Sequence, residues 1–329
     1  MVNQADVRLF ADKCKAIFEQ VGRDIIGQQD VVALTVIAMI AGGNVLLEGV
    51  PGIGKTRLIR SLGRVFSLPF SRIQFTPDLM PADITGTDVL EKDGAGNASY
   101  TFRPGPIFSH IVLADEINRA TPKTQSALLE AMQEHVVTVG GRDYRLEEPF
   151  FVLATQNPIE QEGTYALPEA QVDRFMFKLL MRYPTVEEMR KIVLMTQETL
   201  DEVAEGVVDG KTLLRMRETA RQIPVTDEII TYTMRLVSST QPASPEAGET
   251  AARMIRLGAS PRAAQALITG AKVRAMVCGR FNVSHEDIDE LACPVLRHRV
   301  KLSYEALAER VAPDEVIKTI VAEQKKKRR

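Results

Sequence analysis

A glycine-rich stretch near the start of the chain has the spacing of a phosphate-binding loop. Gly49-Val50-Pro51-Gly52-Ile53-Gly54-Lys55-Thr56 matches the pattern G-x-x-x-x-G-K-S/T, between an apolar run and a helical pattern. Glycines let such a loop curl so that its backbone N–H groups face phosphate oxygens. We expect Lys55 to reach the β- and γ-phosphates and the Thr56 hydroxyl to hold Mg²⁺. The residues expected to bind nucleotide here are Pro51, Gly52, Ile53, Gly54, Lys55, Thr56 and Arg57.

Two adjacent carboxylates follow the apolar run at residues 111–114. They would lie at a strand end, where α/β sheets place their ligands. Asp115 is expected to hold Mg²⁺ through water, and Glu116 to polarise an attacking water. Asn157, which follows the run at 150–154, is the polar side chain expected to reach the γ-phosphate or that water; by pattern alone it is equally a turn residue before proline.

The elements that must position these residues alternate between short apolar runs and helical patterns, which predicts β–α–β units and a parallel sheet. Helices are expected within residues 1–41, punctuated by Gly22 and by Gly42 and Gly43, and at 123–133. Strands are expected at residues 44–48, 71–75, 111–114 and 150–154. From residue 186 onward helix formers dominate, with breaks at 206–210, Pro224, 242–248 and Pro294, which predicts a smaller all-helical domain.

Length and composition fit this picture. The chain has 329 residues, which at roughly 150 residues per domain predicts two domains. A hydrophobic content of 45% and a charged content of 26% are typical of globular proteins and exclude disordered, collagen-like and coiled-coil classes. The longest apolar run, 31–41, is shorter than the roughly 20 residues that cross a bilayer, and we expect no signal peptide.

Charge and cysteine usage add two further expectations. The formal charge of −2 argues against non-specific nucleic-acid binding over the whole surface. The basic tail, residues 325–329, is expected to be a solvated, disordered end, the alternative being a contact to nucleic acid or to an acidic partner. Cys14, Cys278 and Cys293 lack metal-site spacing, so we expect buried, inert thiols in a reducing cytoplasm.

Five ordered motifs together resemble the MoxR family of AAA+ ATPases. They are the phosphate loop and the segments DEINRA at 115–120, ATQNP at 154–158, LPEAQVDRF at 167–175 and GASPR at 258–262. The resemblance covers nearly the whole chain. It implies a phosphate-loop α/β core, residues 1–185, with a five-stranded parallel sheet flanked by helices, and then a helical lid domain, residues 186–329.

Carried over position by position, the resemblance also implies roles for single residues. Asp115 and Glu116 match the Walker B pair, and Asn157 matches sensor 1. Arg174 matches the arginine finger, which in this family acts on the nucleotide of a neighbouring subunit. Arg262 in the lid matches sensor 2. An arginine supplied across an interface neutralises charge that develops on the transferred phosphoryl group.

For several residues and segments, the sequence is compatible with two different roles. Gly27 and Gln28 resemble the segment that packs on adenine in AAA+ proteins, and they also fit a helix-start turn. Arg119 either faces a neighbouring subunit or caps the local helix. Insertions near 85–108 and a hairpin near 136–145, with the two-residue signal Gly140-Gly141, fit the family and would contact what is remodelled; the second also fits a solvated hairpin.

The function implied by the resemblance is that of an Mg²⁺-ATP hydrolase working as a ring, expected to be a hexamer. Such ATPases act as chaperones that assemble or activate client complexes, often metal-dependent enzymes, with partners that carry a von Willebrand factor A domain. One alternative is a nucleic-acid motor, disfavoured by the acidic balance and the absence of tryptophan. Another is an ATP-gated scaffold with little hydrolysis, disfavoured by Glu116 and Arg174.

Overall fold

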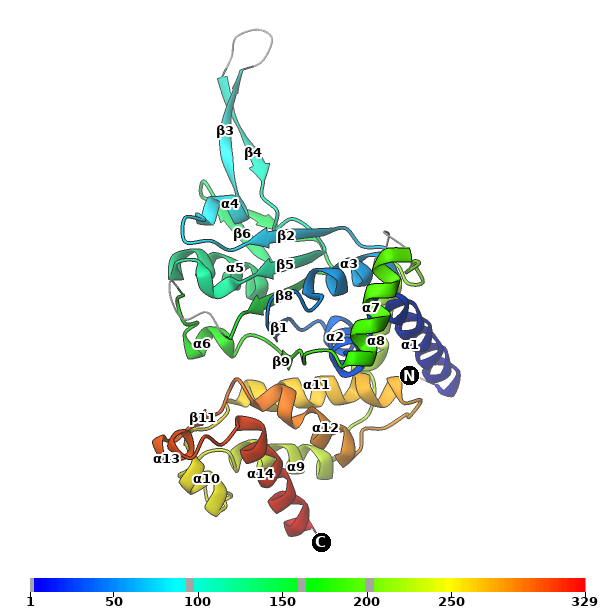
Figure 1. Ribbon diagram of the computed structural model, residues 1–329, viewed down its shortest axis with the longest axis vertical. Coiled ribbons are helices and arrows are strands. Elements are labelled where there is room, and N and C mark those ends of the chain that lie inside the picture. The colour runs from blue at the N-terminus through cyan, green and yellow to red at the C-terminus, as the bar shows by residue number, and fades with distance from the viewer. Residues whose placement is uncertain (1–2, 93–97, 159–163, 199–203, 329) are drawn as a thin grey trace.

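The computed structural model describes residues 3–92, 98–158, 164–198 and 204–328. The upper half of the molecule in Figure 1 holds a five-stranded sheet with helices around it, and the lower half is a group of helices. The sheet consists of β1 (Val45–Glu48), β2 (Phe70–Gln74), β5 (Ile111–Asp115), β8 (Phe151–Gln156) and β9 (Phe177–Leu180). Its strand order is β2-β5-β8-β1-β9 with parallel pairs throughout, which confirms the predicted fold class.

The central strands of the sheet are buried on both faces, and their alternate residues therefore enter two separate hydrophobic clusters. Leu113 and Leu153 pack on the face covered by α1 (Gln4–Asp24), α2 (Gln29–Ala41) and α3 (Lys55–Val65). Val112 and Val152 pack on the opposite face, against α5 (Pro122–Glu134). Continuous apolar runs rather than alternating ones are what a doubly covered parallel strand requires.

Two of the expected breaks in helices are wrong. Gly22 lies inside α1, two residues before its last residue, Asp24, and Pro294 lies inside α12 (His285–Leu296). Pro294 is buried together with Leu291 and Val295, and this packing outweighs the hydrogen bond that proline cannot donate. The apolar run at 31–41 is the buried helix α2, which contacts β9 as well as α8 (Gly210–Arg221) and α11 (Pro261–Val277).

Two antiparallel hairpins extend from the core. β3 (Gly86–Lys92) and β4 (Ala98–Pro104) form the ribbon that projects at the top of Figure 1; the insertion's residues 93–97 lie outside the described residues. β6 (Val136–Val139) and β7 (Arg142–Arg145) are joined by Gly140 and Gly141, with φ of 58° and 77° as a type I′ turn requires. The Phe102 and Tyr144 rings stack between the two hairpins, with centroids 3.8 Å apart.

The chain that follows β9 is helical apart from one short strand pair. The remaining elements are α6 (Glu169–Val172, which precedes β9), α7 (Val186–Glu198), α9 (Asp227–Ser238), α10 (Glu249–Met254), α13 (Tyr304–Ala308), α14 (Pro313–Arg328) and the pair β10 (Ile255–Leu257) with β11 (Lys301–Leu302); α4 (Pro81–Thr85) precedes β3. The long helix α11 lies directly beneath the core and packs on α9 and α12. The domain boundary near residue 185 stays a prediction.

The C-terminal tail and one cysteine differ from expectation. The basic residues continue α14 as helix through residue 328 instead of being disordered, while Arg329 lies outside the described residues. Lys325 Nζ lies 3.1 Å from an Asp289 carboxylate oxygen, an ion pair that helps hold the tail on the lid. Cys14 is buried, whereas Cys278 is exposed because it ends α11 at the surface. Across the described part of the chain, no helix combines the length and apolarity needed to cross a membrane.

Candidate nucleotide site

The phosphate loop connects the end of β1 to the start of α3. Gly52 and Gly54 have φ of 80° and 93°, values that side-chain-bearing residues rarely adopt, and the space where their Cβ atoms would lie is open. Lys55 is the first residue of α3 and only 8% exposed, and its Nζ donates a hydrogen bond of 2.9 Å to the Gly49 carbonyl. The loop therefore carries a buried ammonium beside the N-terminus of an eleven-residue helix.

The acidic pair lies at the end of β5 and is fixed by the neighbouring strand. Asp115 is 8% exposed, and its Oδ1 accepts a 2.7 Å hydrogen bond from the Thr155 hydroxyl of β8. The same hydroxyl oxygen accepts a 2.9 Å bond from the Glu116 backbone N–H. Glu116 has a φ of 58°, which turns the chain away from the strand into the short 3₁₀ helix at Ile117–Arg119. Thr155 thereby sets the positions of both acids.

Strand order brings the predicted residues together at one edge. β8 lies between β5 and β1, so Asn157, just beyond β8, is between the acidic pair and the phosphate loop. Asn157 is 5% exposed, and the Gly49 N–H donates to the Gln156 carbonyl at 3.3 Å, which joins the loop to that strand end. Lys55, Asp115 and Asn157 thus share the carboxyl edge of the sheet, where α/β folds bind ligands.

Two residues of β2, which sequence reasoning missed, contact the acidic pair. Arg72 donates from Nη2 and Nε to Asp115 Oδ2 at 2.7 and 3.2 Å. Gln74 Nε2 donates to Glu116 Oε2 at 3.0 Å, and Arg119 Nη1 reaches the same oxygen at 3.0 Å. Arg72 and Gln74 alternate along β2, and this period-two spacing beside an acidic strand end was the signal available.

Gly27 and Gln28 lie close to the start of α7. Gln28 adopts the left-handed conformation, and its Nε2 donates a 2.6 Å hydrogen bond to the Arg182 carbonyl. A Cβ on Gly27 would come within 2.6 Å of the Glu188 carboxylate, which would have to shift, and the φ of 70° itself disfavours any side chain there. Arg182 pairs with Glu188, and this contact together with the Thr185 N–H lowers the pKa of the Glu188 carboxyl to about 2. This segment therefore links the core to the first helix after β9.

Arg57, the remaining residue expected in the loop region, turns toward other helices. Its Nη2 lies 4.0 Å from an Asp24 carboxylate oxygen and 3.9 Å from the Met195 sulfur of α7. These contacts place the Arg57 side chain between the end of α1 and α7. These contacts hold the Arg57 side chain in place between the two helices, and the nucleotide contact expected from the sequence stays a prediction.

Arg174 and Arg262 lie together, at a different edge. Arg174 precedes β9, in whose register Phe177 pairs with Val45 at the start of β1 and Leu180 pairs with Glu48 at its end. The finger candidate therefore lies at the amino edge of the sheet, about 13 Å or more from the loop that follows Glu48. Arg174 Nη1 donates to the Leu129 carbonyl at 2.9 Å.

The two arginines share a cavity of about 400 Å³ lined also by Asp173 and Arg299. Arg262 Nη1 is 3.9 Å from Asp173 Oδ2, which also accepts a 2.8 Å hydrogen bond from Ser260. No phosphate-loop residue lines this cavity among the described residues. Within one subunit, the structure thus separates the two arginines from Lys55.

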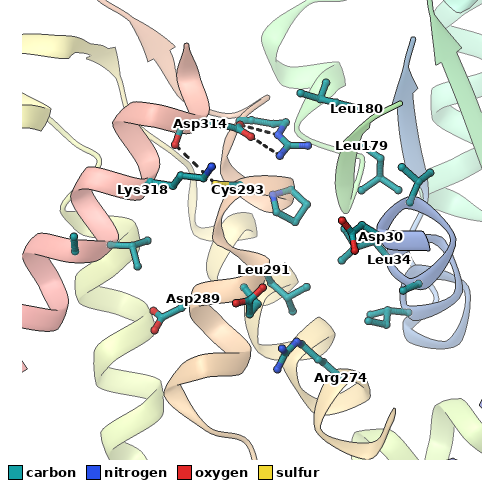
Figure 2. A pocket seen from close by; sticks show the side chains of 18 of the residues that line it. Asp30, Leu34, Leu179, Leu180, Arg274, Asp289, Leu291, Cys293, Asp314 and Lys318 are labelled. Atoms are coloured by element: carbon teal, nitrogen blue, oxygen red, sulfur yellow. Dashed lines mark hydrogen bonds and ion pairs between the residues drawn. The ribbon is translucent and has the colours of Figure 1, made fainter. Parts of the chain in front are cut away.

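A larger cavity, of about 760 Å³, lies between core and lid and holds none of the predicted nucleotide-site residues (Figure 2). Leu34 of α2 and Leu179 of β9 line it from the core, and Cys293 of α12 and Lys318 of α14 from the lid. Burial raises the pKa of the Cys293 thiol and keeps it protonated. The cavity marks where lid and core are incompletely packed.

The oxygen donors near the loop fit magnesium. A threonine hydroxyl at Thr56 and a carboxylate at Asp115 are hard ligands of the kind Mg²⁺ takes, alongside waters and phosphate oxygens. The described residues contain no cluster of three or more histidine, cysteine or acidic side chains that could form a cage of protein ligands. Metal binding that depends on the phosphates of a nucleotide agrees with this sparse donor set.

Comparison with known proteins defines the class. Residues 44–177 match the profile of the ATPase family associated with various cellular activities, and residues 248–320 match the AAA lid domain. A crystal structure of a presumed ATPase from Cytophaga hutchinsonii is 40% identical and superposes with a TM-score of 0.89, over 96% of this chain and 95% of that one. The chain is an AAA-type ATPase domain with its lid.

Sequence relatives define the family. Chaperone MoxR1 of Mycobacterium tuberculosis is 43% identical over 307 residues, which span 93% of this chain and 80% of that protein. Protein MoxR of Methylorubrum extorquens is 31% identical over 313 residues, 90% of each chain. The chain belongs to the MoxR family of AAA+ ATPases, as its motifs predicted.

Proposed function

We propose that this protein hydrolyses ATP with Mg²⁺ at sites shared between neighbouring copies of the chain in a homo-oligomeric ring, with six subunits as the expected number. The observation that supports this is the separation of Arg174 and Arg262 from Lys55 across the sheet. A head-to-tail contact, repeated around a closed ring, would bring the amino edge of one subunit to the phosphate loop of the next.

Each residue of the site has a defined task in this proposal. Backbone N–H groups of the phosphate loop and Lys55 bind the phosphates, and Glu116 holds the attacking water in line with Asn157 beside it. A magnesium ion held by Thr56 and Asp115 would neutralise phosphate charge. Arg174 and Arg262 of the neighbour would stabilise charge that develops on the γ-phosphoryl group. Gly27 and Gln28 would pack on the adenine.

The energy of hydrolysis is proposed to remodel a client protein complex in the cytoplasm. Membership of a family with a relative named as a chaperone supports this role. The β3–β4 hairpin, which projects from the core, and the β6–β7 hairpin are the proposed client contacts, and a protein with a von Willebrand factor A domain is the proposed partner. A metal-dependent enzyme is the client class we propose.

Mixing two inactive variants tests the shared site. Lys55→Ala removes the phosphate contact and Arg174→Ala removes the finger, so each alone should lose ATP turnover. In an equal mixture, about one interface in four joins an intact Lys55 to an intact Arg174, and about a quarter of the wild-type rate should return. Arg190→Ala, at an exposed arginine of α7, is the control and should stay active. Mixtures that co-assemble without recovering activity would refute the shared site.

A further inference from the structure

Three consecutive lid residues that follow α12 bind backbone carbonyls of the segment that carries Arg174. Arg297 Nη1 donates to the Lys178 carbonyl at 2.9 Å, and His298 Nε2 lies 3.1 Å from the Phe175 carbonyl. Arg299 penetrates furthest, with a side chain only 3% exposed. A sequence of this composition resembles a solvated charge cluster, so nothing in the sequence indicated this burial.

All three guanidinium nitrogens of Arg299 donate hydrogen bonds to residues 173–176. Its Nε donates to Asp173 Oδ1 at 2.8 Å, and its Nη2 donates to the Asp173 and Phe175 carbonyls at 3.1 and 2.7 Å. Its Nη1 donates to the Met176 carbonyl at 3.1 Å and to the Val295 carbonyl of α12 at 2.6 Å. The Asp173 and Phe175 carbonyls are those on either side of Arg174, so one lid side chain fixes the backbone that flanks the finger.

Asp173 extends the same arrangement to the second arginine. Its Oδ1 receives the Arg299 hydrogen bond, and its Oδ2 receives the Ser260 hydroxyl at 2.8 Å and lies 3.9 Å from Arg262 Nη1. Ser260 is the N-cap of α11, the helix on which Arg262 lies. The Asp173 carboxylate and the buried Arg299 guanidinium thus connect the backbone around Arg174 with the start of α11, which carries Arg262.

We propose that Arg299, acting through Asp173, is a positioning residue that holds Arg174 and Arg262 in the geometry needed to complete a neighbour's nucleotide site. The inference rests on the proposed function. It means that the lid of one subunit is joined directly to the groups that serve the next subunit's nucleotide, so a lid displacement moves the finger.

The chemistry of the guanidinium explains why arginine occupies this position. Burial lowers the pKa of Arg299, and the Asp173 carboxylate beside it opposes that shift, so the side chain stays charged. A planar group with five N–H donors in a fixed fork can bind several carbonyls in different directions at once. A lysine ammonium keeps the charge but is a single point with three donors, and it cannot hold the Asp173, Phe175 and Met176 oxygens together.

Arg299→Lys is therefore the principal variant. We expect ATP turnover to fall about 10- to 100-fold, because misplacing a catalytic group by about 1 Å costs this much. The affinity of each subunit's own site for a fluorescent ATP analogue should change less than about twofold, since the variant leaves the Lys55 edge intact. Mixing with Lys55→Ala subunits, which carry an intact Arg299 and Arg174, should return activity toward a quarter of wild type.

Arg217→Lys is the matched control. Arg217 is also a buried arginine, and its hydrogen bonds go to the Met39 and Ile40 carbonyls and to the Glu148 carboxylate rather than to the carbonyls of residues 173–176. It should lose comparable thermal stability yet keep turnover. Asp173→Asn, which keeps an acceptor for Arg299 but loses the charge facing Arg262, is the milder second variant should Arg299→Lys fail to fold, and it should show the same rescue.

The outcomes separate the inference from the proposed function. Turnover of Arg299→Lys within twofold of wild type, while Arg174→Ala is inactive, would overturn the positioning role alone. Lost turnover that Lys55→Ala subunits fail to restore, while they do restore Arg174→Ala, would also overturn it, because the damage would then lie in the variant's own site. If Lys55→Ala restores neither variant in co-assembled mixtures, the shared site itself is wrong.

Discussion

Arg72 and Asp115 form an ion pair across the adjacent strands β2 and β5, and the two hydrogen bonds between them end on the same oxygen, Asp115 Oδ2. The other carboxylate oxygen is occupied by the Thr155 hydroxyl. The acid proposed to hold magnesium is therefore neutralised by a side chain of its own subunit. Metal binding and the Arg72 contact stabilise the same carboxylate charge. The stabilisation that either one adds should therefore be smaller when the other is present.

Replacing Arg72 tests this balance. In Arg72→Met the mostly buried Asp115 loses its counter-charge, and we expect the free energy of unfolding in EDTA to fall by about 1 to 2 kcal/mol, a value reduced because Arg72 is half exposed. Magnesium with a non-hydrolysable ATP analogue should restore most of this loss. Thermal unfolding of wild type and Arg72→Met, with and without magnesium and the ATP analogue, measures this loss of stability. An equal loss in both conditions would contradict the prediction.

Glu116→Gln should separate ATP binding from hydrolysis. The amide keeps an oxygen that can accept from Gln74 and Arg119, so the local structure is retained. It cannot polarise water as a carboxylate does, and phosphate release should fall about 100-fold or more. Equilibrium binding of a fluorescent ATP analogue should stay within about twofold.

The control for that variant is Glu130→Gln, at an exposed carboxylate on α5, which should hydrolyse ATP at the wild-type rate. If Glu116→Gln keeps normal turnover, Glu116 has no part in the mechanism. If it loses ATP binding as well, its role is in building the site rather than in the chemical step.

The sequence predicted the core of the fold because its signals are local. The runs that became β5 and β8 are continuous and apolar, as doubly covered strands must be, and the phosphate loop has a fixed spacing. β9 was not found by pattern, since its four residues include Lys178 and it has no flanking turn signal. Pro294 shows the opposite failure, where tertiary burial overrides a local helix-breaking signal.

Contacts between distant segments were beyond prediction. Arg72 reaches Asp115 across 43 residues of sequence, and Arg299 reaches Asp173 across 126. Both are ordinary charged residues in sequence, and their meaning depends on strand order and on how the lid docks. Single residues with strong motifs can be proposed from sequence, whereas the groups that orient them require the packed structure.

From the burial of His298 we predict that the free energy of unfolding depends on pH. His298 is buried, and burial, followed by the charge of Arg299, lowers its pKa well below the ordinary value of 6.5. Nε2 contacts the Phe175 carbonyl, whereas Nδ1 is buried with no hydrogen-bond partner among the described residues, so a second proton has no acceptor. The folded protein holds His298 neutral, while the unfolded chain takes up a proton below pH 6.5.

Stability from this group is therefore complete above pH 6.5 and is lost as the pH falls below it, at up to about 1.4 kcal/mol per pH unit. In His298→Gln, whose amide can still donate to the Phe175 carbonyl, this slope should be reduced. Urea unfolding between pH 7 and pH 5 compares the two proteins. Parallel pH profiles for wild type and variant would show that His298 is not the group that titrates.

The Phe102–Tyr144 stack predicts an energetic coupling between the two hairpins. The rings lie nearly parallel, at 20°, and Phe102 also packs edge-on against Phe108, so the base of the projecting β3–β4 ribbon is held by aromatic contacts. A double-mutant cycle of Phe102→Leu and Tyr144→Leu should give a coupling of about 1 kcal/mol in the free energy of unfolding. Basal ATP turnover should be unchanged, since neither ring touches the nucleotide edge.

Tyr100 supplies the matched comparison, because it lies on the same strand as Phe102 but is 73% exposed. The cycle of Tyr100→Leu with Tyr144→Leu should show no coupling beyond about 0.3 kcal/mol, as expected for residues without contact. If the hairpins act together on a client, the Phe102 and Tyr144 variants should lose client-stimulated turnover to the same extent singly and combined. Additive losses would mean that the two hairpins contact the client independently.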